Sequence, residues 1–182
     1  MKLIIFLCLA VTGLTAQSKV AVVAGNNLAI CADGLSSGEC RYAQAGIKLS
    51  LKRLKPELSD WRFVVIDSRR WSSTCKKFKL DPCVPAFSDI DQHATYLIST
   101  LLVNNTRLDE DLQRYSNLTG QDRLDWVISH ELGHILCATA SERVAENASG
   151  KLRYSNRHQS GCKPQQSFAP AKGNRFAVTL AQ

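Results

Sequence analysis

The stretch Gln121–Cys137, QDRLDWVISHELGHILC, has the spacing pattern of a long amphipathic helix. Its apolar residues recur three or four positions apart, so a helix places them on one side: Leu124, Val127, Ile128, Ile135 and Leu136. Thr119 lies just before the stretch, and Asp122 lies three residues after Thr119. This spacing is a helix start signal in which Asp replaces the usual Glu or Gln. We therefore predict a helix over these residues.

The residues before this stretch contain short runs of the kind that form strands. Three runs have this character: Lys19–Ala24, Trp61–Asp67 and Ala94–Ser99. The segments between these runs and after them have apolar residues at helical spacing. They predict helices from Ala43 to about Pro56, from Ser68 to Phe78, from Leu108 to Tyr115 and from Glu142 to Arg153. Strands in the first part and helices behind them predict a small single α+β domain with a short sheet.

The composition is that of an ordinary globular protein. The chain has 182 residues, of which 45% are hydrophobic and 21% charged, and its mean hydropathy is −0.14. These values exclude a collagen-like, coiled-coil or wholly disordered chain. The formal net charge is +7, but basic pairs such as Lys52-Arg53 and Lys76-Lys77 are scattered, and no nucleic-acid-binding motif is present. We therefore expect solvated basic helix faces and no nucleic-acid partner.

The N-terminus has the parts of a secretory signal peptide. Lys2 supplies a positive charge, residues 3–11 form an apolar run, and Ala16 is a small residue at a suitable cleavage position. The apolar run is too short to span a membrane as a helix. We predict a signal peptide over residues 1–16 and one domain over residues 17–182, secreted to an extracellular or periplasmic space without a stable membrane anchor.

Six cysteines remain once Cys8 leaves with the signal peptide, and an even number in an exported chain predicts three disulfides. Short loops close most easily, which favours Cys31–Cys40, Cys75–Cys83 and Cys137–Cys162, although other connectivities stay open. No two cysteines have the CxxC spacing of a zinc knuckle, so we expect no cysteine-ligated metal. We expect these disulfides to stabilise the small domain by cross-linking it.

Residues 130–134, HELGH, form the pattern HExxH inside the predicted helix and contain two of the chain's four histidines. Residues four positions apart point the same way on a helix, so His130 and His134 can bind one Zn²⁺. Glu131 lies beside the first ligand, where it can take a proton from a water molecule that zinc has acidified. The spacing therefore predicts a zinc site with Glu131 as general base.

The motif resembles that of the zincin metallopeptidases, and the residues after it indicate a branch. The metzincin continuation is absent, because Cys137 and Ala140 stand where a Gly and a third His would be. Residues 142–145, ERVA, instead resemble the ExxA pattern of gluzincins, most of all compact members of the ImmA/IrrE-like kind. The resemblance covers about residues 125–152 and implies that Glu142 is the third zinc ligand.

Other residues stay open as parts of this site. Glu146 lies one turn after Glu142 and is a second candidate for the third ligand, and His158 is another. The resemblance also implies a donor that stabilises an oxyanion, for which His158, Tyr154 and Arg153 are candidates. It further implies a sheet edge that aligns an extended peptide, which we expect at the strand around Tyr96.

We expect an exported zinc metalloendopeptidase that hydrolyses peptide bonds, acts on a peptide or protein substrate and is a monomer. His130, His134 and Glu142 would bind Zn²⁺, and Glu131 would be the general base. An exported zincin-like binding or decoy module without turnover is the main alternative. A cationic, disulfide-rich protein that binds no metal is a third interpretation.

Overall fold

The computed structural model describes residues 19–82, 84–102, 118–155, 160–162 and 175–177. The predicted signal peptide, the predicted helix Leu108–Tyr115 and His158 lie outside the described residues.

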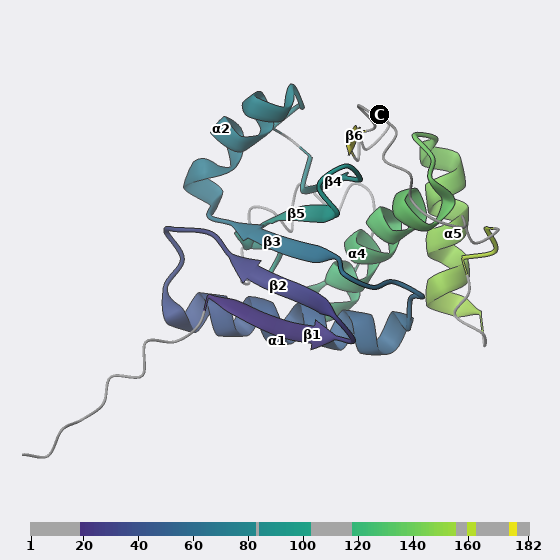
Figure 1. The fold of residues 1–182 in the computed structure, drawn as a ribbon, viewed down its shortest axis with the longest axis horizontal. Helices are drawn as coiled ribbons and strands as arrows, with labels where there is room; N and C mark the ends of the chain where they lie inside the picture. Colours follow the sequence, from purple (N-terminus) through teal and green to yellow (C-terminus); the bar gives the residue numbers. More distant parts are fainter. Residues whose placement is uncertain (1–18, 83, 103–117, 156–159, 163–174, 178–182) are drawn as a thin grey trace, which may run out of the picture.

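A six-stranded sheet runs through the described structure in the order β1-β2-β3-β5-β4-β6 (Figure 1). The strands are β1 (Val20–Ala24), β2 (Asn27–Cys31), β3 (Arg62–Ile66), β4 (Ala86–Asp89), β5 (Ala94–Ile98) and β6 (Arg175–Ala177). Strands β2, β3 and β5 are parallel, whereas β1 is antiparallel to β2, and β4 is antiparallel to both β5 and β6. Among the described strands, β4 therefore lies one position from the end of the sheet, with only the three-residue β6 outside it.

Helices cover both faces of the sheet (Figure 1). They are α1 (Ser37–Leu54), α2 (Ser68–Phe78), the short 3-10 helix η1 (Ser99–Leu101), α4 (Gly120–Cys137) and α5 (Glu142–Tyr154). Successive side chains of a strand point to opposite faces, so Phe63 and Val65 of β3 join the core with α1 and α4, while Ile66 packs with Trp71 and Phe78 of α2. Helix α5 packs on α4 and so lies next to the residues of the HExxH motif.

The predicted fold class is confirmed, because the described residues form a small single α+β domain with a short sheet. Cys31 pairs with Cys40 and Cys137 pairs with Cys162, as expected. Cys83 lies outside the described residues, so the Cys75–Cys83 disulfide stays a prediction. The two disulfides suggest an oxidising, extracellular-type environment. Within the described part of the chain, no helix combines the length and the apolar character needed to cross a membrane.

Some predicted elements differ from the structure. The strand around Tyr96 is β5, which lies between β3 and β4, so the expectation that it forms a sheet edge is wrong. Helix α1 ends at Leu54 because Lys55 adopts a left-handed conformation (φ 46°) directly before Pro56. Helix α2 spans the predicted residues, and its N-cap is Asp67, whose carboxylate accepts a hydrogen bond from the Arg69 N–H. Strands β2, β4 and β6 are missing from the sequence-based prediction.

Candidate metal centre

Helix α4 holds the HExxH residues in a buried position. His130, Glu131 and His134 are 5%, 0% and 0% exposed, respectively. Helix α4 packs against the sheet through apolar side chains and also binds α1 through Asp125. The Asp125 carboxylate accepts hydrogen bonds from Ser50 at 2.6 Å and from Arg53 at 2.9 Å, both on α1. This contact between α1 and α4 holds the helix in place without involving the HExxH side chains.

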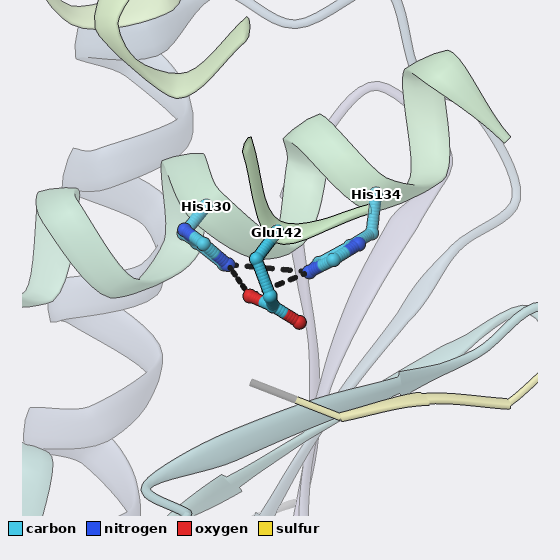
Figure 2. A group of neighbouring side chains, drawn as sticks. All are labelled: His130, His134 and Glu142. Carbon is cyan, nitrogen blue, oxygen red and sulfur yellow. Dashed lines mark hydrogen bonds and ion pairs between the residues drawn. The ribbon is translucent and has the colours of Figure 1, made fainter. Parts of the chain in front are cut away.

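Three side chains from two helices converge at one point (Figure 2). His130 and His134 lie one turn apart on α4, and Glu142 is the first residue of α5. The Nε2 atom of His130 is 3.0 Å from Oε2 of Glu142 and 3.2 Å from Nε2 of His134. The remaining separation, from His134 Nε2 to Glu142 Oε2, is 3.6 Å. The group can therefore hold a metal ion.

These separations fit a tetrahedral metal site. Bonds of about 2.0–2.2 Å to imidazole nitrogen and carboxylate oxygen place neighbouring ligand atoms about 3.3 Å apart. The three separations in the cluster, 3.0, 3.2 and 3.6 Å, bracket that value. Three protein ligands leave a fourth position open, which is typical of catalytic rather than structural zinc sites.

The outer nitrogens of both imidazoles have partners that orient the rings. His134 Nδ1–H donates to the backbone carbonyl of Thr139 at 2.8 Å, and His130 Nδ1 is 2.9 Å from Glu146 Oε2. Arg153 in turn donates to the other carboxylate oxygen of Glu146 at 3.0 Å. Because the acceptors require a proton on each Nδ1, a neutral ring presents its Nε2 lone pair to the centre. Metal-binding histidines commonly have such outer partners.

The tight approach of α5 to α4 brings Glu142 to the histidines. Helix α4 ends at Cys137, its C-cap Ala138 turns the chain sharply in a left-handed conformation (φ 44°), and α5 starts only four residues after Ala138. Gly133, between the two histidines, lies in close contact with α5, because a Cβ there would lie 2.3 Å from the carbonyl oxygen of Ala145. Ala145 is itself fully buried on α5. The position of Glu142 therefore depends on a glycine within the motif.

Replacement of Gly133 by Ala is expected to force α5 away from α4, because the obstacle is backbone rather than a flexible side chain. We expect the free energy of unfolding to fall by about 3 kcal/mol and metal affinity to fall with it, as measured by denaturant unfolding and metal titration. The matched control is Gly150→Ala on α5, where no atom lies within 4 Å of the added Cβ. This control should gain about 0.5–1 kcal/mol of stability from better helix propensity. Equal stability of Gly133→Ala and the unchanged chain would contradict the expectation.

Glu131 is held from the sheet by a chain of buried hydrogen bonds. The Trp61 indole N–H donates to Thr95 Oγ1 at 2.9 Å, Thr95 and Ser88 hydroxyls are 2.9 Å apart, and Ser88 donates to Glu131 Oε2 at 2.6 Å. An indole nitrogen can only donate, so every bond in the chain is directed toward the Glu131 carboxylate. The second oxygen, Oε1, is buried and has no hydrogen-bond partner among the described residues. Glu131 therefore keeps one acceptor atom available.

The buried setting changes the acidity of these groups. Burial raises the pKa of Glu131 to about 7, although the Ser88 hydrogen bond and the nearby His130 lower it in part. Burial lowers the pKa of His130, but the Glu146 hydrogen bond and the negative charges of neighbouring glutamates outweigh it, so the pKa is raised overall. Burial is also the main reason that the pKa of His134 is lowered. A pKa near 7 suits a general base that works at neutral pH.

The structure brings His130, His134 and Glu142 together, with Glu131 beside them. Glu146, the second candidate for the third ligand, contacts the outer nitrogen of His130 instead of the centre. Arg153, a candidate oxyanion donor, binds Glu146, and Tyr154 is 75% exposed.

Sequence reasoning missed Ser88, Thr139 and the packing role of Gly133. Ser88 lies on β4, a four-residue strand whose sequence AFSD has no strand pattern, and Thr139 contributes a backbone carbonyl that any residue would supply. Gly133 did carry a signal, because a glycine inside a helix is unfavourable and suggests close packing.

Comparisons with models of protein families, with curated proteins and with solved structures each found no match to this chain. Its function is therefore inferred from its own side chains.

Proposed function

We propose that this chain is an exported zinc-dependent metalloendopeptidase, resembling the gluzincin branch of the zincins, that hydrolyses peptide bonds. The convergence of His130, His134 and Glu142 at tetrahedral spacing, with both outer imidazole nitrogens engaged, is the observation that carries the proposal. The two disulfides and the signal-like N-terminus support export.

The donor set favours zinc over other metals. Two imidazoles and one carboxylate are borderline ligands that suit Zn²⁺, whereas Mg²⁺ and Ca²⁺ prefer sites made of oxygen atoms alone. The same set with an open fourth position is known from zinc hydrolases. When bound, zinc would supply the Lewis acidity that makes a water molecule nucleophilic at neutral pH.

Glu131 has the properties required of the general base. Its Oε2 is fixed by Ser88, and Oε1 is free to take a proton, because no described residue binds it. Burial raises the pKa of Glu131 to about 7, so the carboxylate can accept a proton and later pass it to the leaving amine. Ser88 thus acts as a positioning residue that keeps the carboxylate from rotating.

Zinc stoichiometry tests the site. We expect the full chain, produced through a secretory pathway so that its disulfides form, to retain about one zinc after dialysis against a weak chelator. His134→Asn should lose the metal, because one of the two ligand nitrogens is removed. The matched control is His93→Asn, since His93 is exposed and outside the cluster. Elemental mass spectrometry supplies the count, and an unchanged zinc content in His134→Asn would contradict the site.

Cleavage of a broad peptide library tests the activity. Hydrolysis that stops with a strong chelator and returns with added zinc would support the peptidase. Zinc held at one per chain without cleavage of any peptide would instead indicate the binding module without turnover.

A further inference from the structure

The C-terminal strand β6 covers the sheet edge beside Glu131. It pairs with β4 in antiparallel register, with Ala177 opposite Phe87, Phe176 opposite Ser88, and Arg175 opposite Asp89. Among the described strands, β6 is the last on this side of the sheet. In Figure 2 the yellow β6 ribbon crosses the view on the side toward which the Glu142 carboxylate extends.

Ser88 connects this edge to the proposed base. Its backbone pairs with β6 opposite Phe176, and its hydroxyl donates to Glu131 at 2.6 Å. Neighbouring strands in a sheet lie about 4.8 Å apart. An extended chain paired with β4 therefore passes one strand spacing from the residue that positions Glu131.

We propose that β6 is a self-inhibitory strand, because it occupies the outer edge of β4, the edge that lies beside Glu131 and that the resemblance to zincins implies for an extended peptide substrate. The inference rests on the proposed peptidase function and adds its regulation. A peptide aligned by β4 would take the backbone positions that residues 175–177 hold, so β6 must leave before the peptide can pair.

Two features suit β6 to a strand that occupies the edge of β4 until a peptide displaces it. It pairs with β4 over only three residues, so a longer peptide can make more backbone hydrogen bonds along the same edge. The Cys137–Cys162 disulfide ties the C-terminal segment to the end of α4, thirteen positions before Arg175. The competition is intramolecular because β6 belongs to the same chain, and the disulfide shortens the covalent link between β6 and α4, which raises the effective concentration of β6 at the edge.

The expected size of the effect follows from occupancy. If β6 occupies the edge for nine-tenths of the time, the apparent KM for a peptide is raised about tenfold, because only the remaining fraction can bind. The rate constant of the bound complex is unaffected. Displacement of β6 should therefore lower KM about tenfold and leave kcat unchanged.

Two variants of the full chain separate strand pairing from side-chain effects. Phe176→Pro/Ala177→Pro removes two successive backbone N–H groups, and since these point to opposite sides of a strand, one of them faces β4. The matched control, Phe176→Val/Ala177→Val, changes the same side chains and keeps both N–H groups. Thermal unfolding and zinc content verify that each variant is folded. If the proline variant does not fold, glycine at all three positions 175–177 weakens the same strand and replaces it.

Peptide binding is the first test and does not depend on catalysis. The probe is a fluorescein-labelled peptide with the sequence of residues 172–182, KGNRFAVTLAQ, and each chain also carries Glu131→Gln so that the probe is not cut. By fluorescence anisotropy, we expect the proline variant to bind the probe about tenfold more tightly than the parent and the valine control. Equal affinity in all three chains would overturn the inference.

Hydrolysis is the second test, in chains that retain Glu131. A KM lowered about tenfold in the proline variant alone, with kcat unchanged, would support self-inhibition. The same KM in all three chains would overturn it. Tighter probe binding by the proline variant, without hydrolysis by any chain, would support β6 as the occupant of the edge and reject the peptidase function. Failure of the β6 inference and failure of the proposed function therefore give different results.

Discussion

Glu131→Gln is expected to retain about one zinc per chain and to lose peptide hydrolysis by about 10³-fold, the scale of an essential general base. Gln has nearly the shape of Glu and its side-chain oxygen can still accept the hydrogen bond from Ser88, so the fold should persist. What is lost is the basic oxygen, because an amide does not take up a proton at neutral pH. Zinc content, thermal unfolding and kcat/KM on a cleaved library peptide measure the three expectations.

The control for this variant is Glu57→Gln. Glu57 is an exposed glutamate on the loop between α1 and β3, outside the cluster, and its replacement removes the same charge. It should leave kcat/KM unchanged. Substantial hydrolysis by Glu131→Gln would show that another group takes the proton, and the mechanism proposed for Glu131 would be wrong.

Glu142→Ala is expected to weaken zinc binding by about 10²–10³-fold. Structural zinc sites bind with roughly 10–16 kcal/mol shared among four ligands, so one ligand contributes about 3 kcal/mol, or a factor on the order of 10². Glu142 supplies the only carboxylate oxygen among the three atoms that converge. Its removal should also abolish hydrolysis at limiting zinc, and competition with a fluorescent zinc chelator measures the affinity.

Glu146→Ala on the same helix is the matched comparison. Glu146 contacts the outer nitrogen of His130, so its loss should reduce zinc affinity by only about 10–100-fold. Both variants remove one partly exposed glutamate from α5, which keeps their effects on the helix similar. A larger loss of affinity in Glu146→Ala than in Glu142→Ala would reverse the assigned roles.

Local patterns in the sequence predicted helices α2, α4 and α5 well, whereas α1 begins at Ser37, six residues before the predicted start at Ala43. Gln121–Cys137 and Glu142–Arg153 differ from α4 and α5 by one residue at a single end, because helical spacing and end signals are properties of neighbouring residues. The Cys31–Cys40 and Cys137–Cys162 disulfides were predicted from loop length. Strands β2, β4 and β6 could not be recognised in this way, since a strand is completed by partners elsewhere in the chain.

The sequence by itself indicated the proposed metal-binding pair and the proposed base, because HExxH on a helix places His130 and His134 on one face and Glu131 beside them. Only the tertiary structure separated Glu142 from Glu146. Both lie on α5, and which one reaches the centre depends on the turn at Ala138 and on the close contact between Gly133 and Ala145. The pairing of Ser88 with Glu131 and of β6 with β4 likewise joins residues more than forty positions apart. Such contacts arise from chain topology and packing, which local spacing does not encode.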